Sequence, residues 1–240
     1  MLAFPVATIL CYHEVDPPQD AHVTVPRLSA KGDGEPEMLR YTATPENFAA
    51  QLDYLQQNGY HVIPLARLVD FLEGRGEPLP PRSVVITVDD GWRCAATSIA
   101  PELRKRGMPF TLFVYPHIIG HGEHALTWPE VEQLARDGVD VESHTLTHPF
   151  LTALDPASLD RELAGSRQEI EKHTGKPVRF LAYPYGDYNP AVMESAAHDG
   201  YDAAVTTSRG PITPEAQPLQ LQRYLVHNDT TLEEFKTFLP

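Results

Sequence analysis

Short apolar segments rich in β-branched residues alternate along the chain with segments that have helical periodicity. Most of the apolar runs are continuous, with no polar residue at every second position. Continuous runs are typical of strands that are buried on both faces of a parallel sheet. The expected strands are residues 6–13, 61–65, 83–89, 109–115, 139–144, 179–184, 202–207 and 219–227.

Capping residues mark where the intervening helices begin. Thr44, Asp155 and Asn189 each stand directly before a proline, which is favoured at the first helical position. Residues 127–130 and 230–233 have the capping-box pattern, and several helices are expected to end at a glycine. About eight β/α units in 240 residues predict a (β/α) barrel. A doubly wound open sheet is the alternative, although its Gly-rich dinucleotide motif is missing.

Composition excludes several classes of protein. The chain has 19 basic and 33 acidic side chains, a formal net charge of −14 at pH 7. Such an acidic chain is a poor candidate for sequence-independent nucleic-acid binding. Hydrophobic residues make up 42% of the chain, as in a folded domain, and no apolar run is long enough to span a membrane. The apolar N-terminus lacks a basic region and a cleavage site, so a first strand is expected there rather than a signal peptide.

One long stretch, residues 16–41, is polar and rich in proline, glycine and charge. Irregular stretches of this length inside a domain are usually functional or mobile. In a barrel this loop would overhang the face formed by the carboxyl ends of the strands. A lid over a substrate and an insertion without a role are both consistent with the pattern.

Two adjacent carboxylates, Asp89 and Asp90, close the expected strand 83–89, and Gly91 follows them. Acidic side chains at the end of a buried strand need a cation or hydrogen bonds to offset their desolvation. Because barrels hold their catalytic groups at the carboxyl ends of strands, this position favours a functional site. A solvated Asp-Gly turn is the alternative.

Two histidines four residues apart, His144 and His148, stand at the end of the expected strand 139–144 and just beyond it. Imidazole nitrogens and a carboxylate oxygen are ordinary ligands of Zn²⁺ and similar metals, and three protein ligands leave positions open for water. Two unrelated loop histidines are the alternative for this pair alone. The paired aspartates on another strand end favour the metal site.

Two further strand ends carry candidate groups. The turn 183–188 is aromatic and stiffened by Pro184, so it could form a pocket wall or aim a backbone N–H at an oxyanion. His13 ends the first expected strand and could act as a general acid near neutral pH. Core packing of the rings and a structural hydrogen bond of the histidine are the alternatives.

Three of these segments together resemble motifs of the NodB-type polysaccharide deacetylases, carbohydrate esterase family four. They are Thr-Val-Asp-Asp-Gly at 87–91, His-Thr-Leu-Thr-His at 144–148 and Tyr-Pro-Tyr-Gly at 183–186. The resemblance implies a distorted (β/α) barrel of seven or eight strands, with residues 1–240 as a single domain. It also implies site roles: Asp89 as the general base, the Tyr185 backbone N–H as part of an oxyanion hole, and a divalent metal on Asp90, His144 and His148.

The chain departs from the family pattern at two places. Ala182 stands where the third motif usually has an arginine that hydrogen-bonds the base, and His227 is the only candidate for a late histidine motif. Together with His13, these departures resemble the circularly rearranged subgroup that includes the biofilm poly-β-1,6-N-acetylglucosamine deacetylases. By that resemblance His13 is the general acid. Arg223, on the last expected strand, could replace the missing arginine near Asp89, or could be a surface residue in an ion pair.

Other residues have weaker assignments. Trp92 could stack on a sugar ring, and Tyr183 and Arg223 are further candidates for substrate contact. Cys11 and Cys94 are expected to be small buried residues, since neither has a nucleophile-and-base arrangement. Glu142 and Ser143 are expected to orient His144. The histidine-rich segment 117–124 could bind a second metal, but its pattern is more typical of a polar loop.

The predicted protein is a metal-dependent hydrolase of carbon–nitrogen bonds that removes N-acetyl groups from an N-acetylglucosamine polymer. Zinc is the default metal, and cobalt, nickel or iron suit the same ligands. The alternatives are a hydrolase of a small amide or cyclic imide, and a sugar-binding module without activity, which the absence of the motif arginine favours. The resemblance implies an N-acetylated polysaccharide as partner and a location outside the cytoplasm or at the cell envelope.

Overall fold

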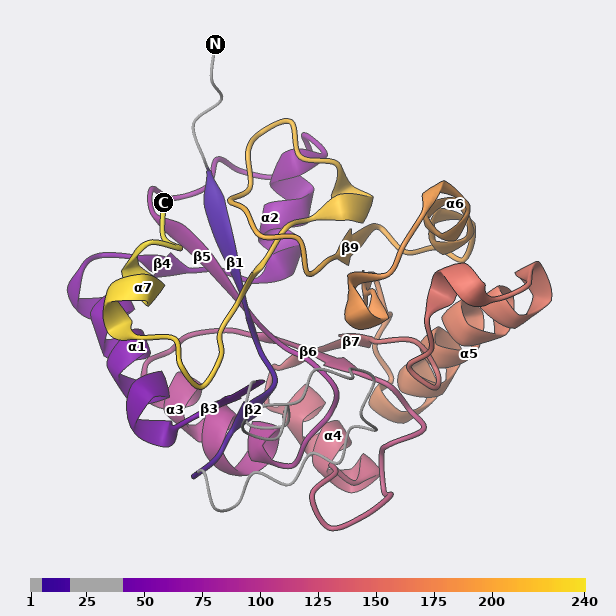
Figure 1. The fold of residues 1–240 in the computed structure, drawn as a ribbon, viewed down its shortest axis with the longest axis horizontal. Coiled ribbons are helices and arrows are strands. Elements are labelled where there is room, and N and C mark those ends of the chain that lie inside the picture. Colours follow the sequence, from indigo (N-terminus) through magenta and orange to yellow (C-terminus); the bar gives the residue numbers. More distant parts are fainter. Residues whose placement is uncertain (1–5, 18–40) are drawn as a thin grey trace, which may run out of the picture.

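The computed structural model describes residues 6–17 and 41–240. Parallel strands form a curled sheet in the middle of the molecule, and helices surround it (Figure 1). The order across the sheet is β10-β1-β5-β6-β7-β8-β9, and β4 pairs with the beginning of β5. The bounds are β1 (Ala7–Tyr12), β4 (His61–Val62), β5 (Ser83–Val88), β6 (Thr111–Val114), β7 (Asp140–Ser143), β8 (Phe180–Ala182), β9 (Ala203–Val205) and β10 (Tyr224–Leu225). The short strands β2 (Glu14–Val15) and β3 (Thr42–Ala43) pair separately.

The two edges of the sheet are joined by the segment that leads into β10. Leu221 forms a parallel bridge with Val205 of β9, and Tyr224 and Leu225 pair with β1. The backbone N–H of Thr206 donates to the Leu221 carbonyl at 2.9 Å. This connection gives the distorted barrel that the sequence predicted.

Burial on both faces explains why the strands are continuously apolar. β1 and β5 pair over their whole length, and every residue of both strands is buried. Successive side chains point to opposite faces of a strand. Leu10 and Ile86 belong to the larger core set, which includes residues of the surrounding helices, whereas Ile9 and Val85 pack on the other face.

The helices begin where the capping residues predicted. The Thr44 side chain accepts from the backbone N–H of Asn47, Asp155 accepts from Ser158, and the capping box of Thr127 and Glu130 is formed. Such caps satisfy backbone N–H groups that have no partner within the helix. The helices are α1 (Pro45–Gln57), α2 (Leu65–Leu72), α3 (Ala100–Lys105), α4 (Trp128–Arg136), α5 (Pro156–Thr174), α6 (Pro190–His198) and α7 (Leu232–Lys236).

Three expected elements differ from the structure. The expected strand 219–227 is reduced to β10, and its first residues belong to a short 3-10 helix, Pro218–Gln220. The expected strand 61–65 is shortened to β4, because Pro64 has no N–H for a strand ladder and α2 begins directly after it. The capping box expected at 230–233 is displaced by one residue, since Thr231 caps α7 by accepting from the Glu234 backbone N–H at 3.1 Å.

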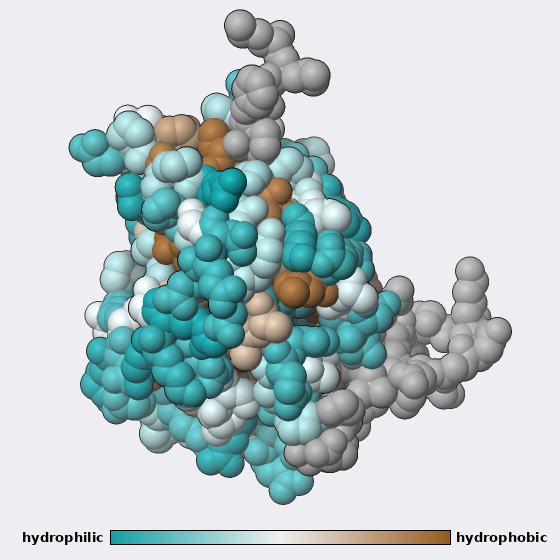
Figure 2. Space-filling model, turned by 90° about the vertical axis from the view of Figure 1, so that its left-hand side faces the viewer, coloured by the Kyte–Doolittle hydropathy of each residue, from teal (hydrophilic) through white to brown (hydrophobic). Residues whose placement is uncertain are grey.

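Most of the predicted loop 16–41 lies outside the described residues. The face that carries α1 and α7 is mostly hydrophilic, with small separate hydrophobic areas (Figure 2). Within the described ranges, no helix combines the length and the apolar character needed to cross a membrane.

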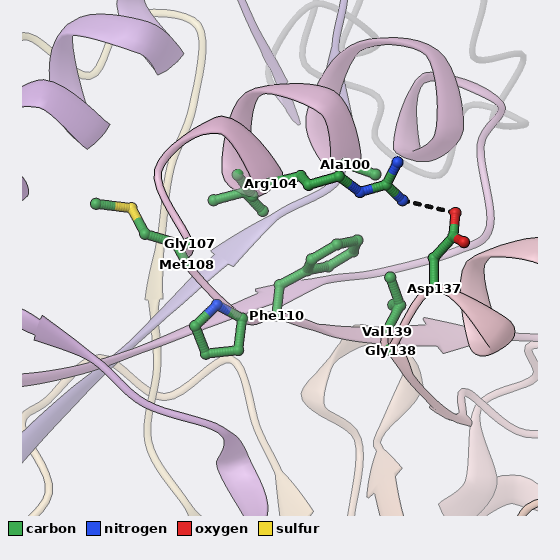
Figure 3. A pocket seen from close by; sticks show the side chains of 10 residues that line it. Ala100, Arg104, Gly107, Met108, Phe110, Asp137, Gly138 and Val139 are labelled. Atoms are coloured by element: carbon green, nitrogen blue, oxygen red, sulfur yellow. Dashed lines mark hydrogen bonds and ion pairs between the residues drawn. The ribbon is translucent and has the colours of Figure 1, made fainter.

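A pocket between α3 and α4 lies at the amino ends of the strands (Figure 3). Phe110 and Val139 line it just before β6 and β7 begin, and Arg104 and Asp137 form an ion pair across it. The predicted site residues follow strands rather than precede them, so this pocket is at the opposite end of the sheet.

Candidate active site

The carboxyl ends of the parallel strands bring the predicted site residues together. His13 follows β1, Asp89 and Asp90 follow β5, His144 follows β7, and Tyr185 follows β8 after two intervening residues. Parallel strands end at the same edge of a sheet, which explains why residues far apart in the sequence meet there.

A buried part of the site is an ion pair between Asp89 and Arg223. Nη1 of Arg223 donates to Oδ1 of Asp89 at 2.8 Å, and Nη2 donates to Oδ2 at 2.7 Å. The same guanidinium donates to Thr87 Oγ1 at 3.1 Å and to the Thr206 carbonyl at 2.9 Å. Both side chains are at most 2% exposed. Arg223 therefore lies beside Asp89 and is not a surface residue.

The charge of Arg223 keeps Asp89 ionised. Burial alone raises the pKa of the Asp89 carboxyl, but the guanidinium outweighs burial and holds that pKa below its usual range. A carboxylate that is ionised and desolvated can accept a proton from a nearby water.

Asp90, His144 and His148 form a second group. One ligating atom from each lies within 4.8 Å of the other two. Nε2 of His144 is 3.5 Å from Asp90 Oδ1, and Nε2 of His148 is 3.7 Å from the same oxygen. The two imidazole rings meet edge to face, with centroids 4.7 Å apart. All three side chains thus point toward one place.

The protonation of the two histidines suits metal binding. Nδ1 of His144 lies 2.7 Å from the Ala182 carbonyl. Because a carbonyl only accepts, Nδ1 carries the proton and Nε2 offers its lone pair. Burial lowers the pKa of His144 and of His148 to about 4, so both rings are neutral at pH 7. One carboxylate and two neutral imidazoles are a donor set that fits zinc or a similar divalent cation.

Unusual backbone geometry is concentrated at the site. Among the described residues, five non-glycine residues have positive φ, and four of them belong to the site loops: Asp90 (79°), Thr145 (65°), His148 (63°) and Tyr185 (60°). Such conformations persist only where the surroundings enforce them, and they cluster at functional sites. The Thr145 hydroxyl accepts from the His148 backbone N–H at 3.1 Å, which holds the histidine loop.

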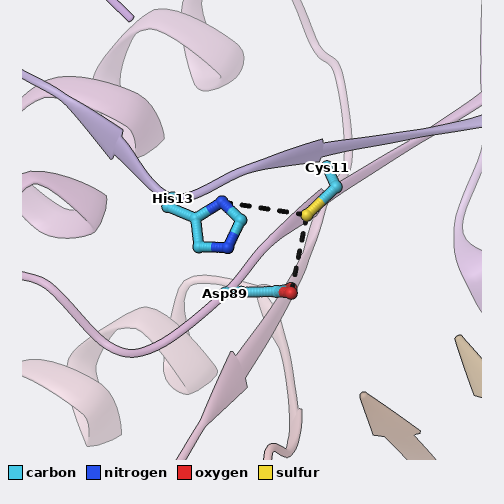
Figure 4. Close-up of side chains that lie close together, drawn as sticks. All are labelled: Cys11, His13 and Asp89. Atoms are coloured by element: carbon cyan, nitrogen blue, oxygen red, sulfur yellow. Dashed lines mark hydrogen bonds between the residues drawn. The ribbon is translucent and has the colours of Figure 1, made fainter. Parts of the chain in front are cut away.

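His13, Asp89 and Cys11 lie close together, and the Cys11 thiol contacts both of the other side chains (Figure 4). Sγ of Cys11 donates to Asp89 Oδ2 at 3.5 Å and is 4.0 Å from Nδ1 of His13. Burial raises the pKa of Cys11 well above its usual value, so it remains a protonated thiol. The sequence predicted Cys11 as a small buried residue, which the structure confirms, but its contacts with both polar groups were not predicted.

The chain matches the family model described as polysaccharide deacetylase over residues 76–204, which is more than half of its length. The chain belongs to the polysaccharide deacetylase family. This membership confirms the resemblance drawn from the three motifs, and it agrees with the prediction of an enzyme that hydrolyses carbon–nitrogen bonds.

Individual members of the family are similar over most of the chain. A Bacillus subtilis protein, YxkH, named as a polysaccharide deacetylase, is 30% identical over 75% of this chain, which spans 64% of that protein's length. The poly-beta-1,6-N-acetyl-D-glucosamine N-deacetylase of Staphylococcus epidermidis is 27% identical over 97% of this chain and 84% of its own. The solved structure of IcaB from Ammonifex degensii has a TM-score of 0.78, with 26% identity, and covers 98% of this chain and 95% of that one.

Two residues predicted to contact the substrate, Tyr183 and Arg223, are buried in the structure. Tyr183 is fully buried, and its hydroxyl donates to the Leu219 carbonyl at 3.2 Å. Arg223 is almost as completely buried, and its guanidinium forms an ion pair with Asp89. Trp92 is partly exposed and donates from Nε1 to Asp90 Oδ2 at 2.9 Å, so it contacts the possible metal ligand directly.

Glu142 and Ser143, which were predicted to orient His144, have other hydrogen-bond partners. Glu142 accepts from the backbone N–H groups of Arg179 and Phe180, both at 2.7 Å, and so ties β7 to β8. The Ser143 hydroxyl bonds to that of Ser166 at 2.8 Å. Within the described part of the chain, neither group forms a hydrogen bond to His144, and the Ala182 carbonyl orients that ring instead.

Sequence reasoning missed two aromatic residues at the site. The Tyr115 ring lies 5.0 Å from the His148 ring, and Phe150 stacks on Tyr185 at 4.2 Å. Tyr115 directly follows β6, so the rule that placed the other groups at strand ends could have found it. Within the described residues, the groups that could hold a metal do not include the histidines of segment 117–124.

Proposed function

We propose that this protein is a metal-dependent N-deacetylase that removes acetyl groups from an N-acetylglucosamine polymer. The observation that carries the proposal is the ionised Asp89 immediately before a convergent group of one carboxylate and two neutral imidazoles. The family and the printed names of its members support acetyl removal, and the Staphylococcus epidermidis relative supports β-1,6-linked poly-N-acetylglucosamine as the substrate.

Asp90, His144 and His148 would hold the metal. A bound divalent cation polarises the amide carbonyl and lowers the pKa of a water molecule. The carboxylate of Asp90 accepts from Trp92, so this ligand is fixed by a hydrogen bond from the rim of the site.

Asp89 acts as the general base. It takes a proton from water as the water oxygen forms a bond to the carbonyl carbon of the acetamide. Arg223 keeps Asp89 ionised and fixes its orientation with two hydrogen bonds. The backbone N–H of Tyr185 donates to the oxygen that becomes negative in the tetrahedral intermediate.

His13 acts as the general acid. A ring nitrogen of His13 lies within 4.8 Å of a carboxylate oxygen of Asp89, so both groups can reach one acetamide. As His13 gives its proton to the amide nitrogen, the carbon–nitrogen bond breaks. The products are acetate and a free amino group on the sugar.

The proposal is tested by acetate release from β-1,6-linked N-acetylglucosamine oligomers with metal-loaded and chelator-treated protein. We expect release that the chelator abolishes and added zinc restores. Hydrolysis of a small amide or ring opening of a cyclic imide, with no acetate released from the oligomers, would overturn the proposal in favour of another hydrolase. Sugar binding without any hydrolysis would overturn it in favour of an inactive binding module. A polymer of this kind implies a location outside the cytoplasm or at the cell envelope, which stays a prediction.

A further inference from the structure

Exposed hydrophobic rings are concentrated at the candidate site. Among the described residues, the exposed large hydrophobic side chains are Tyr41, Phe150, Tyr185 and Leu232. The Tyr41 ring lies 4.8 Å from that of His13, and the Tyr185 ring lies 4.6 Å from that of His148. Phe150 stacks on Tyr185 with an angle of 18° between the rings. Exposed apolar residues that gather in one place mark a binding surface, whereas single ones need no explanation.

The stacked pair of Phe150 and Tyr185 is held in place by its two loops. Asp187 accepts from the Thr152 backbone N–H at 2.8 Å and from the Thr152 hydroxyl at 2.9 Å, which joins the loops. The Tyr185 carbonyl accepts from the Thr207 hydroxyl at 3.3 Å. Two exposed rings are therefore fixed before any ligand binds, which reduces the entropy cost of binding.

The rings contact one another in the order His148, Tyr185, Phe150, so Tyr185 joins Phe150 to a possible metal ligand. Phe150 has no polar atom on its side chain and is 44% exposed although it stacks on Tyr185. The C–H groups on one face of a pyranose ring form an apolar surface that can pack on such a ring. A sugar unit whose acetamide is at the metal group would have its neighbour in the polymer near this pair.

We infer that the Phe150–Tyr185 pair is a binding subsite for the sugar unit next to the one that is deacetylated. The inference rests on the proposed function and adds a specificity-determining residue, Phe150. The subsite makes the enzyme favour oligomers over substrates too short to reach it.

The test compares acetate release from N-acetylglucosamine oligomers of increasing length, with zinc-loaded wild type, Phe150→Ala and Phe150→Tyr. For the wild type, kcat/KM is expected to rise from the dimer to the hexamer. In Phe150→Ala the ratio of hexamer to dimer kcat/KM should fall roughly 3- to 10-fold, as expected for the loss of one ring contact, mainly through KM of the hexamer. Phe150→Tyr keeps the ring and should keep the ratio.

Leu232→Ala is the matched control, because Leu232 is also an exposed hydrophobic residue but begins α7. It should leave the ratio at the wild-type value. A wild type that releases acetate without any preference for length, or a Phe150→Ala variant that keeps the preference, would overturn the subsite and leave the proposed function standing. A wild type that releases no acetate from any oligomer would overturn both.

Discussion

Replacing Arg223 by methionine should strongly destabilise the protein, because it leaves a buried carboxylate without its partner. Arg223 makes two hydrogen bonds to Asp89 and one each to Thr87 and Thr206, all at 3.1 Å or less. Breaking a buried ion pair from one side costs about 3–5 kcal/mol. For a chain of this size, that loss lowers the melting temperature by roughly 6–20 °C.

The assay is urea unfolding of metal-free protein, with Arg104→Met as the control. Arg104 also pairs with an aspartate, but its side chain is 60% exposed, so its loss should cost at most about 1 kcal/mol. Because the double variant Arg223→Met/Asp89→Asn removes the unpaired charge, it should be less destabilised than the sum of the two single variants. Equal stability losses in Arg223→Met and Arg104→Met would refute the reasoning.

The same variant should change the pH dependence of activity and stability. In the wild type the pKa of Asp89 is depressed on folding, so its stabilising effect is complete at neutral pH and declines as the pH falls below the unfolded value of about 4. Without Arg223, burial raises that pKa. The acidic limb of the kcat/KM profile should therefore move to higher pH in Arg223→Met.

Two further predictions concern other buried groups. Burial raises the pKa of Glu14 to about 7, so the folded state keeps a proton that the unfolded state has lost, and stability should fall by up to about 3 kcal/mol as the pH rises from 4.5 to 7. Urea midpoints of the metal-free protein at pH 5 and pH 8 should show a larger decline in stability in the wild type than in Glu14→Gln, in which the other buried carboxyls with raised pKa values, Asp140 and Glu142, remain. An identical decline in both proteins would contradict the assignment. Cys11 and Cys94 are buried thiols with raised pKa values, so iodoacetamide should label neither in the native protein and both in guanidinium, as measured by mass spectrometry. Rapid native labelling would show that these thiols are accessible.

Local sequence rules predicted the strands and most of the helix starts because both depend on neighbouring residues. Continuous apolar runs need only burial on two faces, and a capping residue acts within its own turn. The displaced start of α7 shows the limit of such rules, since Thr230 and Thr231 are equally good caps by type. Thr231 caps the helix, while the Thr230 hydroxyl accepts from the His227 backbone N–H.

The contacts that complete the site depend on how the barrel closes, and local sequence patterns do not predict that closure. Arg223 is 134 residues from Asp89 in the chain, and its burial follows from the segment that joins β9 to β1. Likewise, Tyr183 and Tyr185 are indistinguishable in the motif, yet the first is fully buried and the second is 46% exposed. The sequence could place residues at strand ends but could not tell which side chains face the site.

The most direct test of the proposed chemistry measures acetate release and bound metal together in the Asp89→Asn variant. This variant should keep the metal, because Asp90, His144 and His148 are intact. Its kcat should fall by at least about 10²-fold, because the general base is lost. His148→Ala is the comparison and should lose both metal and activity. Wild-type turnover in Asp89→Asn, with metal bound, would contradict the assignment of Asp89 as the base.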